Sequence, residues 1–295
     1  MHKRVSALFI LASAIVGNLE AQPVAQTASR SFTKNISCTP ATVFVVNAEK
    51  ATMMVTGWNN NYIQVRINYF ARHPDLAIAN RELGYMQFGI ANEKDYVALQ
   101  NIFKLPAAVD HIQSKLEIKM ELMVPVRNKL QLTNKYGEIN LVRLTGNIQV
   151  TISFGDLRFT DVGGNLVANA GYSDIRGNCI NIASLNCTDE QSKISLDLDG
   201  GGHYSFFSKQ GDLDLSIKKI GSLNIKSNRS DVTIRPQDLD GCRYKLISTD
   251  GTLYLPGKYT DRLIKKGNQT SFITTGSLSL PLLAVNASYN SVTIK

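Results

Sequence analysis

The chain has 295 residues, of which 43% are hydrophobic and 19% charged, and its formal net charge is +8. This length is sufficient to bury a core of its own. The basic residues after position 21 are scattered, and their only doublets are Lys218-Lys219 and Lys265-Lys266. Nucleic-acid binding favours a concentrated basic stripe, so we exclude nucleic acid as a partner.

Residues 1–21 have the features of a secretory signal sequence. A basic start over residues 2–4 precedes an apolar run over residues 7–16, and Leu-Glu-Ala at residues 19–21 forms a cleavage site. The apolar run is shorter than the roughly 20 residues that span a bilayer, and no later segment is apolar enough to span one. We therefore expect export to the periplasm, the outer-membrane surface or the extracellular space, with a net charge of +7 after cleavage.

The first third of the mature chain is predicted to cover the end of a larger β structure. Residues 22–37 are polar and are predicted to be flexible, whereas residues 38–128 are rich in strand patterns and are predicted to form a cap. One short helix is expected from Pro74 to Leu83, because proline suits the first helical position and the glycine that follows suits the stop. A continuous strand pattern is expected over residues 86–103.

A repeat organises residues 129–295. Three phrases copy one another at a spacing of 18 residues, namely YGEI at 136–139, FGDL at 154–157 and YSDI at 172–175. Apolar residues alternate between the phrases, which is typical of strands with one buried face. A fixed period in this range indicates a solenoid. We predict an all-β parallel β-helix, or β-solenoid, with right-handed coils of about 18–21 residues.

The small residue in each phrase is predicted to form the corner of a coil. Sharp corners often need a positive φ or a side chain that bonds its own backbone, and Gly, Ser and Asn supply these. The preceding aromatic residues Tyr136, Phe154 and Tyr172 are predicted to stack from coil to coil. The predicted corner residues are Gly137, Gly155, Ser173, Ser192, Gly211, Ser230, Gly251, Gly276 and Asn290.

The position after each corner is predicted to form an acidic column, because Glu138, Asp156 and Asp174 occupy it in consecutive coils. Carboxylates stacked about 4.8 Å apart repel one another and need relief. Bound calcium would provide it, and so would exposure with each Asp accepting a backbone N–H at its own corner. Lys193 interrupts the column before Asp212, so we predict a structural acidic corner without calcium.

Other candidate residues are few. Trp58, the single tryptophan, is expected either to close the end of a core or to offer a surface platform to a glycan. The chain contains no nucleophile elbow, zinc-binding helix motif or phosphate loop, so no catalytic, cofactor or metal residues are predicted.

Two cysteines form a candidate disulfide. Cys179 and Cys187 flank what is predicted to be a short insertion, and an exported protein meets an oxidising compartment. Closing so short a loop would stabilise the fold by about 2–3 kcal/mol. The alternative is buried thiols, and the pairing of Cys38 and Cys242 is left open.

These features resemble a known family. The phrases above, Gly57-Trp58 before the strand at 62–70, and Met123-Val124-Pro125 before the first repeat resemble bacterial "putative adhesin" domains of unknown function over most of residues 42–295. The resemblance implies a secreted β-helix protein of the cell envelope with an adhesin-like or scaffolding role, without catalysis, whose partner is an envelope protein or a glycan. The alternatives are a polysaccharide lyase or hydrolase and a glycan-binding module.

Overall fold

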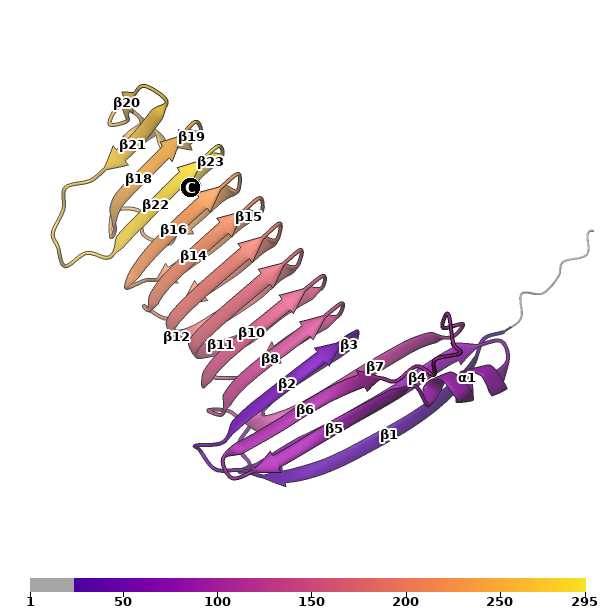
Figure 1. Cartoon of the computed structure of the whole chain (residues 1–295). Coiled ribbons are helices and arrows are strands. Elements are labelled where there is room, and N and C mark those ends of the chain that lie inside the picture. Colours follow the sequence, from indigo (N-terminus) through magenta and orange to yellow (C-terminus); the bar gives the residue numbers. More distant parts are fainter. Residues whose placement is uncertain (1–23) are drawn as a thin grey trace, which may run out of the picture.

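The computed structural model describes residues 24–295 and shows an all-β chain with two short helices (Figure 1). Its 23 strands form one open sheet in which pairing follows two long ladders. Strands β11 (Asp156–Gly171) and β12 (Asp174–Glu190) connect these ladders, because each strand runs through both of them. The signal sequence predicted for residues 1–21 lies outside the described residues.

The first ladder, which we name ladder A, begins with an antiparallel hairpin, continues with parallel strands and ends with a second hairpin. Its strands in spatial order are β5 (Met86–Glu93), β6 (Tyr96–Phe103), β2 (Val43–Glu49), β8 (Lys129–Lys135), β10 (Asn147–Ser153), the second halves of β11 and β12, β14 (His203–Lys209), β16 (Ser222–Asn228), β22 (Leu282–Ser288), β18 (Arg243–Thr249), β21 (Gln269–Ile273) and β20 (Ile264–Lys266).

The second ladder, ladder B, lies on the other side of the same core. Its strands in spatial order are β1 (Gln26–Ser37), β4 (Tyr62–His73), β7 (Lys115–Pro125), β3 (Ala51–Trp58), β9 (Glu138–Val142), the first halves of β11 and β12, β13 (Lys193–Asp199), β15 (Asp212–Lys219), β17 (Asp231–Pro236), β23 (Ser291–Ile294) and β19 (Thr252–Tyr254).

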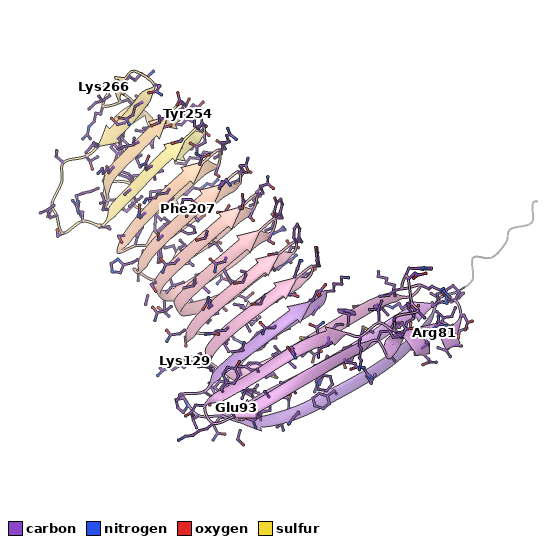
Figure 2. All side chains as sticks on the ribbon, in the orientation of Figure 1. Arg81, Glu93, Lys129, Phe207, Tyr254 and Lys266 are labelled. Carbon is purple, nitrogen blue, oxygen red and sulfur yellow. The ribbon has the colours of Figure 1, made fainter. Side chains whose placement is uncertain are left out.

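Pairing in both ladders follows the sequence repeat. Ile148 lies opposite Leu130 on one side and Leu166 on the other, which is an offset of 18 residues in each direction. The alternating apolar residues of β10 are at most 2% exposed, so the period of two does place one face of each strand in the core. Side chains of the opposite parity cover the outside, where Phe207 and Tyr254 stand half-exposed (Figure 2).

We call one strand of ladder A, together with the ladder B strand that follows it, a coil. Each coil turns from A to B at a residue in the left-handed region, with φ between 52° and 59°. This residue lies one position earlier than predicted, so the positive φ belongs to the aromatic or polar residue and not to the small one. The residues are Lys50, Tyr136, Phe154, Tyr172, Gln191, Gln210, Arg229, Asp250 and Tyr289.

The small residue that follows does not have the positive φ, but where it is serine its side chain does bond the nearby backbone as predicted. A Cβ atom on Gly155 would lie 1.8 Å from the carbonyl oxygen of Gly137 in the neighbouring coil, so the glycine permits a close approach of two backbones. Where serine occupies the position, its hydroxyl completes the corner. Ser173 Oγ donates to Gly171 O at 2.8 Å and accepts from Gly155 N at 3.2 Å. The corner residues are thus selected by contact between coils.

The C-terminal coils depart from the predicted order. The last coil, 282–294, lies between the coils 222–236 and 243–254, because β22 pairs with both β16 and β18 and β23 pairs with both β17 and β19 (Figure 1). Gly276 is therefore not a corner: it lies in the loop between β21 and β22, and Leu278, two residues further on, is 85% exposed.

The N-terminal region combines confirmed predictions with corrections. Residues 22–37, expected to be flexible, contain the strand β1, which pairs with β4 along twelve residues. Helix α1 (Leu76–Leu83) confirms the expected helix, although it begins after Asp75, whose carboxylate caps it, and not at Pro74. The expected continuous strand over 86–103 is the hairpin β5–β6. The second helix, α2 (Gly257–Thr260), lies beyond β19.

Neither helix among residues 24–295 is long and apolar enough to cross a membrane.

Candidate binding groove beside Trp58

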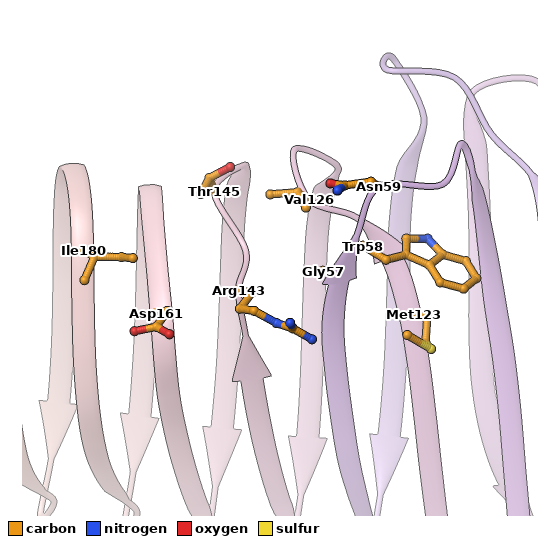
Figure 3. Close-up of a pocket in the computed structure, with 9 residues that line it drawn as sticks. All are labelled: Gly57, Trp58, Asn59, Met123, Val126, Arg143, Thr145, Asp161 and Ile180. Carbon is orange, nitrogen blue, oxygen red and sulfur yellow. The ribbon is translucent and has the colours of Figure 1, made fainter.

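A groove lies where the antiparallel N-terminal strands meet the regular coils (Figure 3). It has a volume of about 590 Å³ and its wall includes Trp58, Met123 and Val126. The chain approaches it through Gly57, where a Cβ atom would lie 1.9 Å from the carbonyl oxygen of Arg143. Glycine at this position therefore lets the end of β3 pack directly on the backbone of the next coil.

Trp58 is fixed in this groove by its neighbours. Its Nε1 donates to the carbonyl oxygen of Tyr62 at 2.9 Å, and the two rings meet edge to face with centroids 4.5 Å apart. The residue is half-buried, so it covers the core and also lines the groove. The two roles considered for this tryptophan are therefore compatible with each other in geometry.

Two charged residues at neighbouring corners complete the groove. Arg143 and Asp161 both have a positive φ, which turns these positions outward from ladder B. Asp161 is engaged, because its Oδ1 accepts from Asn178 Nδ2 at 2.6 Å. The Arg143 guanidinium, by contrast, has no ion pair or hydrogen bond with any residue in 24–295.

A second hollow of about 320 Å³ adjoins the first and shares Asn59 with it. The asparagines at 59–61, Arg127, Asn128 and two prolines line it. Asn128 is 3% exposed, and its Nδ2 has no hydrogen-bond partner within the described chain. A buried amide donor without a partner costs about 1–3 kcal/mol, so the Asn128 amide is a local cost to the fold beneath the hollow.

The predicted aromatic column is present on a different side of the molecule. The rings of Tyr136, Phe154 and Tyr172 stack with adjacent centroids 5.1 Å apart and planes within 18° of parallel. Each ring is about half-exposed. Because the faces of the rings cover one another, the column contributes to cohesion between coils and offers mainly ring edges to solvent.

The acidic column is also present, and its relief differs from the prediction. Arg176 reaches both Asp156 and Asp174, at 3.2 and 3.0 Å, so a neighbouring cation compensates the two stacked carboxylates. Asp231 accepts from the backbone N–H of Ser291 in the adjacent coil at 2.8 Å, and not from its own corner. Within residues 24–295, no three His, Cys, Asp or Glu side chains gather as a metal site would require.

Cys179 and Cys187 are both buried and are free thiols in this structure, and the disulfide between them stays a prediction. The predicted insertion between them is absent, because residues 174–190 form the single strand β12 and pair in register with neighbouring coils. Burial raises the pKa of Cys179 to about 12 and also raises that of Cys187, which makes both thiols poor nucleophiles.

One buried carboxyl was not singled out from the sequence. Asp189 is 1% exposed in ladder A, and it accepts a hydrogen bond from Ser208 Oγ at 3.0 Å in the next coil. Burial raises the pKa of Asp189 to about 7, although the Ser208 hydrogen bond opposes the shift. The alternating pattern hid this residue, because an Asp at an inward position has no distinctive sequence signal.

Sequence reasoning singled out Trp58 but missed the polar part of the groove. The sequence analysis singles out neither the asparagines at 59–61 nor Arg127, Asn128 and Arg143. The one available signal was three consecutive asparagines directly after the single tryptophan. The other groove residues are distant in sequence, so only the stacking of coils brings them together.

Comparison with known proteins gives distant similarity. No protein-family model matches the chain, and no curated protein matches its sequence. Among solved structures, a "putative cell adhesion protein" from Clostridium sporogenes shares 11% identity at a TM-score of 0.30, covering 91% of this chain and 99% of that one. A "putative adhesin" from Bacteroides fragilis shares 10% at 0.33, covering 90% and 97%. A "Putative lipid binding protein" from Parabacteroides distasonis shares 10% at 0.34, covering 90% and 96%. These scores are too low to assign the chain to a family.

Proposed function

We propose that this chain is an exported, non-catalytic, adhesin-like protein that binds a partner of the bacterial cell envelope through the groove beside Trp58. The observation that carries the proposal is the unpaired polar lining of the groove, namely the guanidinium groups of Arg143 and Arg127. The regular coils on one side and the antiparallel strands on the other fix the backbone that carries these side chains, and Tyr62 fixes the ring of Trp58.

The proposal includes the architecture that presents this groove. The parallel coils of residues 43–58 and 129–294 would form a right-handed β-solenoid, and the hairpins at its two ends would protect its open edges. The fixed coil-to-coil offset and the inward alternation support this view. The handedness stays a prediction that rests on the general preference of parallel crossovers.

The rival hypothesis is a polysaccharide lyase or hydrolase. Such enzymes need a base or a pair of carboxylates beside the bound sugar. The groove contains one carboxylate, Asp161, and Asn178 holds it at 2.6 Å. Because this carboxylate is already hydrogen-bonded, the arrangement favours binding of a sugar chain over its cleavage.

The test uses the mature chain from Gln22, labelled with a fluorophore, and isolated bacterial envelopes. We expect saturable binding that unlabelled protein competes away, and no release of new reducing or unsaturated sugar ends. Binding that is absent or never saturates would contradict the adhesin-like role, and steady release of sugar fragments would support the rival. Mass spectrometry of the exported chain should find Gln22 as its first residue, and retention of residues 1–21 would contradict export by cleavage.

A further inference from the structure

The groove beside Trp58 presents donors without acceptors. The guanidinium groups of Arg127 and Arg143 have no ion pair within residues 24–295, and the Nδ2 of Asn128 is buried without a partner. A guanidinium carries five N–H donors and no acceptor. Arg176 and Arg235 are paired with Asp side chains, whereas Arg158, Arg229 and Arg262 also lack an ion pair within residues 24–295. The groove is distinguished because two such guanidinium groups lie in hollows that adjoin Trp58.

The charge of these donors points to an anionic ligand. The carboxylate of Asp161 already accepts from Asn178, and the second hollow contains no acidic residue. Arginine pairs with carboxylates in a planar bidentate geometry, which gives both strength and orientation. A ligand that brings carboxylates to Arg127 and Arg143 would provide acceptors for both guanidinium groups.

The remaining wall suits sugar rings. Trp58 is held in one orientation by Tyr62, and Pro40 and Pro125 add further rigid apolar surface in the second hollow. The amides at 59–61 can donate to hydroxyl groups and accept from them. The two hollows share Asn59 in their walls, so sugar units bound in both would be neighbours.

A peptide ligand is less well matched to this site. Peptides often bind by adding a strand to a free sheet edge. The strand that borders the groove, β3, already pairs with β7 on one side and β9 on the other. The backbone there has no free edge, so recognition must come from side chains.

We propose that the groove binds uronate units of an acidic polysaccharide, with Arg127 and Arg143 on the sugar carboxylates and Trp58 against a pyranose ring. This inference rests on the proposed function, for which it names the class of ligand.

The experiment is calorimetric titration of the mature chain with oligomers of galacturonate, hyaluronate and alginate. At least one uronate oligomer should bind with saturable stoichiometry, and its methyl-esterified form should bind at least tenfold more weakly. Arg127→Gln and Arg143→Gln should each weaken binding at least tenfold. The matched control is Arg158→Gln, at an exposed arginine of β11 outside the groove, which should leave affinity within twofold.

Several outcomes would overturn the inference. These are binding of none of the three oligomers, equal binding of acid and ester, affinity unchanged in both groove variants, or equal binding of polyglutamate, which would indicate general charge attraction. If any of these occurs while the native chain still binds envelopes, the adhesin-like function stands and only the ligand class fails. Circular dichroism of each variant separates a loss of affinity from a loss of fold.

Discussion

The regular coils from 129 to 236 and the C-terminal coils from 243 to 294 are built from the same kind of sequence but are assembled differently. In the regular part, each coil pairs with the coil before it in the chain. In the C-terminal part, the last coil is inserted between two earlier ones. At the N-terminal end, strands that are distant in sequence also pair. Strand β2 lies beside β8, although 79 residues separate the end of β2 from the start of β8.

The comparison shows that the repeat encodes the shape of a coil and not its position in the stack. Each coil presents the same kind of alternating face and backbone edge, so coils that are distant in sequence pair in the same way as consecutive ones. The ends differ because a ladder must stop. The hairpins β5–β6 and β20–β21 occupy the two ends of ladder A. The coil 282–294, which is the last in sequence, therefore lies inside the ladder and not at its end. Four measurements would test this comparison.

The largest effect is expected at a corner glycine of the regular coils. Gly155→Ala would place a Cβ atom 1.8 Å from a backbone oxygen of the neighbouring coil, so the two coils must separate. We expect the free energy of unfolding in urea to fall by about 3–4 kcal/mol. The matched variant is Gly276→Ala in the C-terminal loop, where the nearest atom is the flexible Arg243 side chain at 3.4 Å.

Gly276→Ala should change stability by less than about 0.5 kcal/mol. Equal losses in the two variants would show that Gly276 is a corner after all and would restore the order of coils predicted from the sequence.

The next effect concerns the buried carboxyl of Asp189. Its folded pKa of about 7 lies above the value of about 3.9 for an exposed aspartate. The protonated form is therefore favoured by folding, so this contribution to stability is complete below about pH 4 and is lost as pH rises through 7. Asp189→Asn mimics the protonated form, and we expect a gain of about 2–4 kcal/mol at pH 8 and little change at pH 4.

Urea titrations at pH 4 and pH 8 measure this difference, with Asp212→Asn at an exposed corner position as the control. In strand β18 of the C-terminal coils, Ser248 occupies the inward position that is equivalent to Asp189. Its hydroxyl does not titrate in this pH range. A pH dependence that is identical in native and Asp189→Asn proteins would contradict the assignment.

A smaller effect is expected from the aromatic corner residues. Phe154 stacks on a ring on each side, whereas Tyr289 at the equivalent corner of the last coil has only the Arg229 guanidinium 6.0 Å from its ring. Phe154→Ala should lower the unfolding free energy by about 1–2 kcal/mol and Tyr289→Ala by about 0.5 kcal/mol. Both residues have a positive φ, so backbone strain cancels from the comparison. Equal losses would show that ring stacking contributes nothing beyond burial.

The smallest perturbation is chemical labelling of thiols. Cys242 near the C-terminal coils is half-buried, whereas Cys179 in the regular coils is buried with a pKa of about 12. Under native conditions, iodoacetamide should modify Cys242 at least about tenfold faster than Cys179. A cross-link between Cys179 and Cys187 in non-reducing mass spectrometry would instead confirm the disulfide predicted from the sequence.

The sequence by itself determined the local structure well. The alternation around Ile148 predicted the buried face of the strands, and the phrases at 136, 154 and 172 predicted the spacing of the coils and the aromatic stack. The segment Pro74 to Leu83, followed by Gly84, predicted the helix, although not its start. These features follow from side-chain periodicity and from capping, which act over a few residues and leave a direct trace in the sequence.

The stacking order of the coils and the groove beside Trp58 could be seen only in the tertiary structure. The position of β22 between β16 and β18 follows from which edges remain free, and a repeat cannot specify this because its coils are equivalent. The groove unites Trp58, Arg127 and Arg143 from segments up to 85 residues apart, which become neighbours only when the coils pair. The residue with positive φ lies one position before the predicted corner residue. The small residue at the predicted position is selected by the close approach of the neighbouring backbone, which the sequence alone does not show.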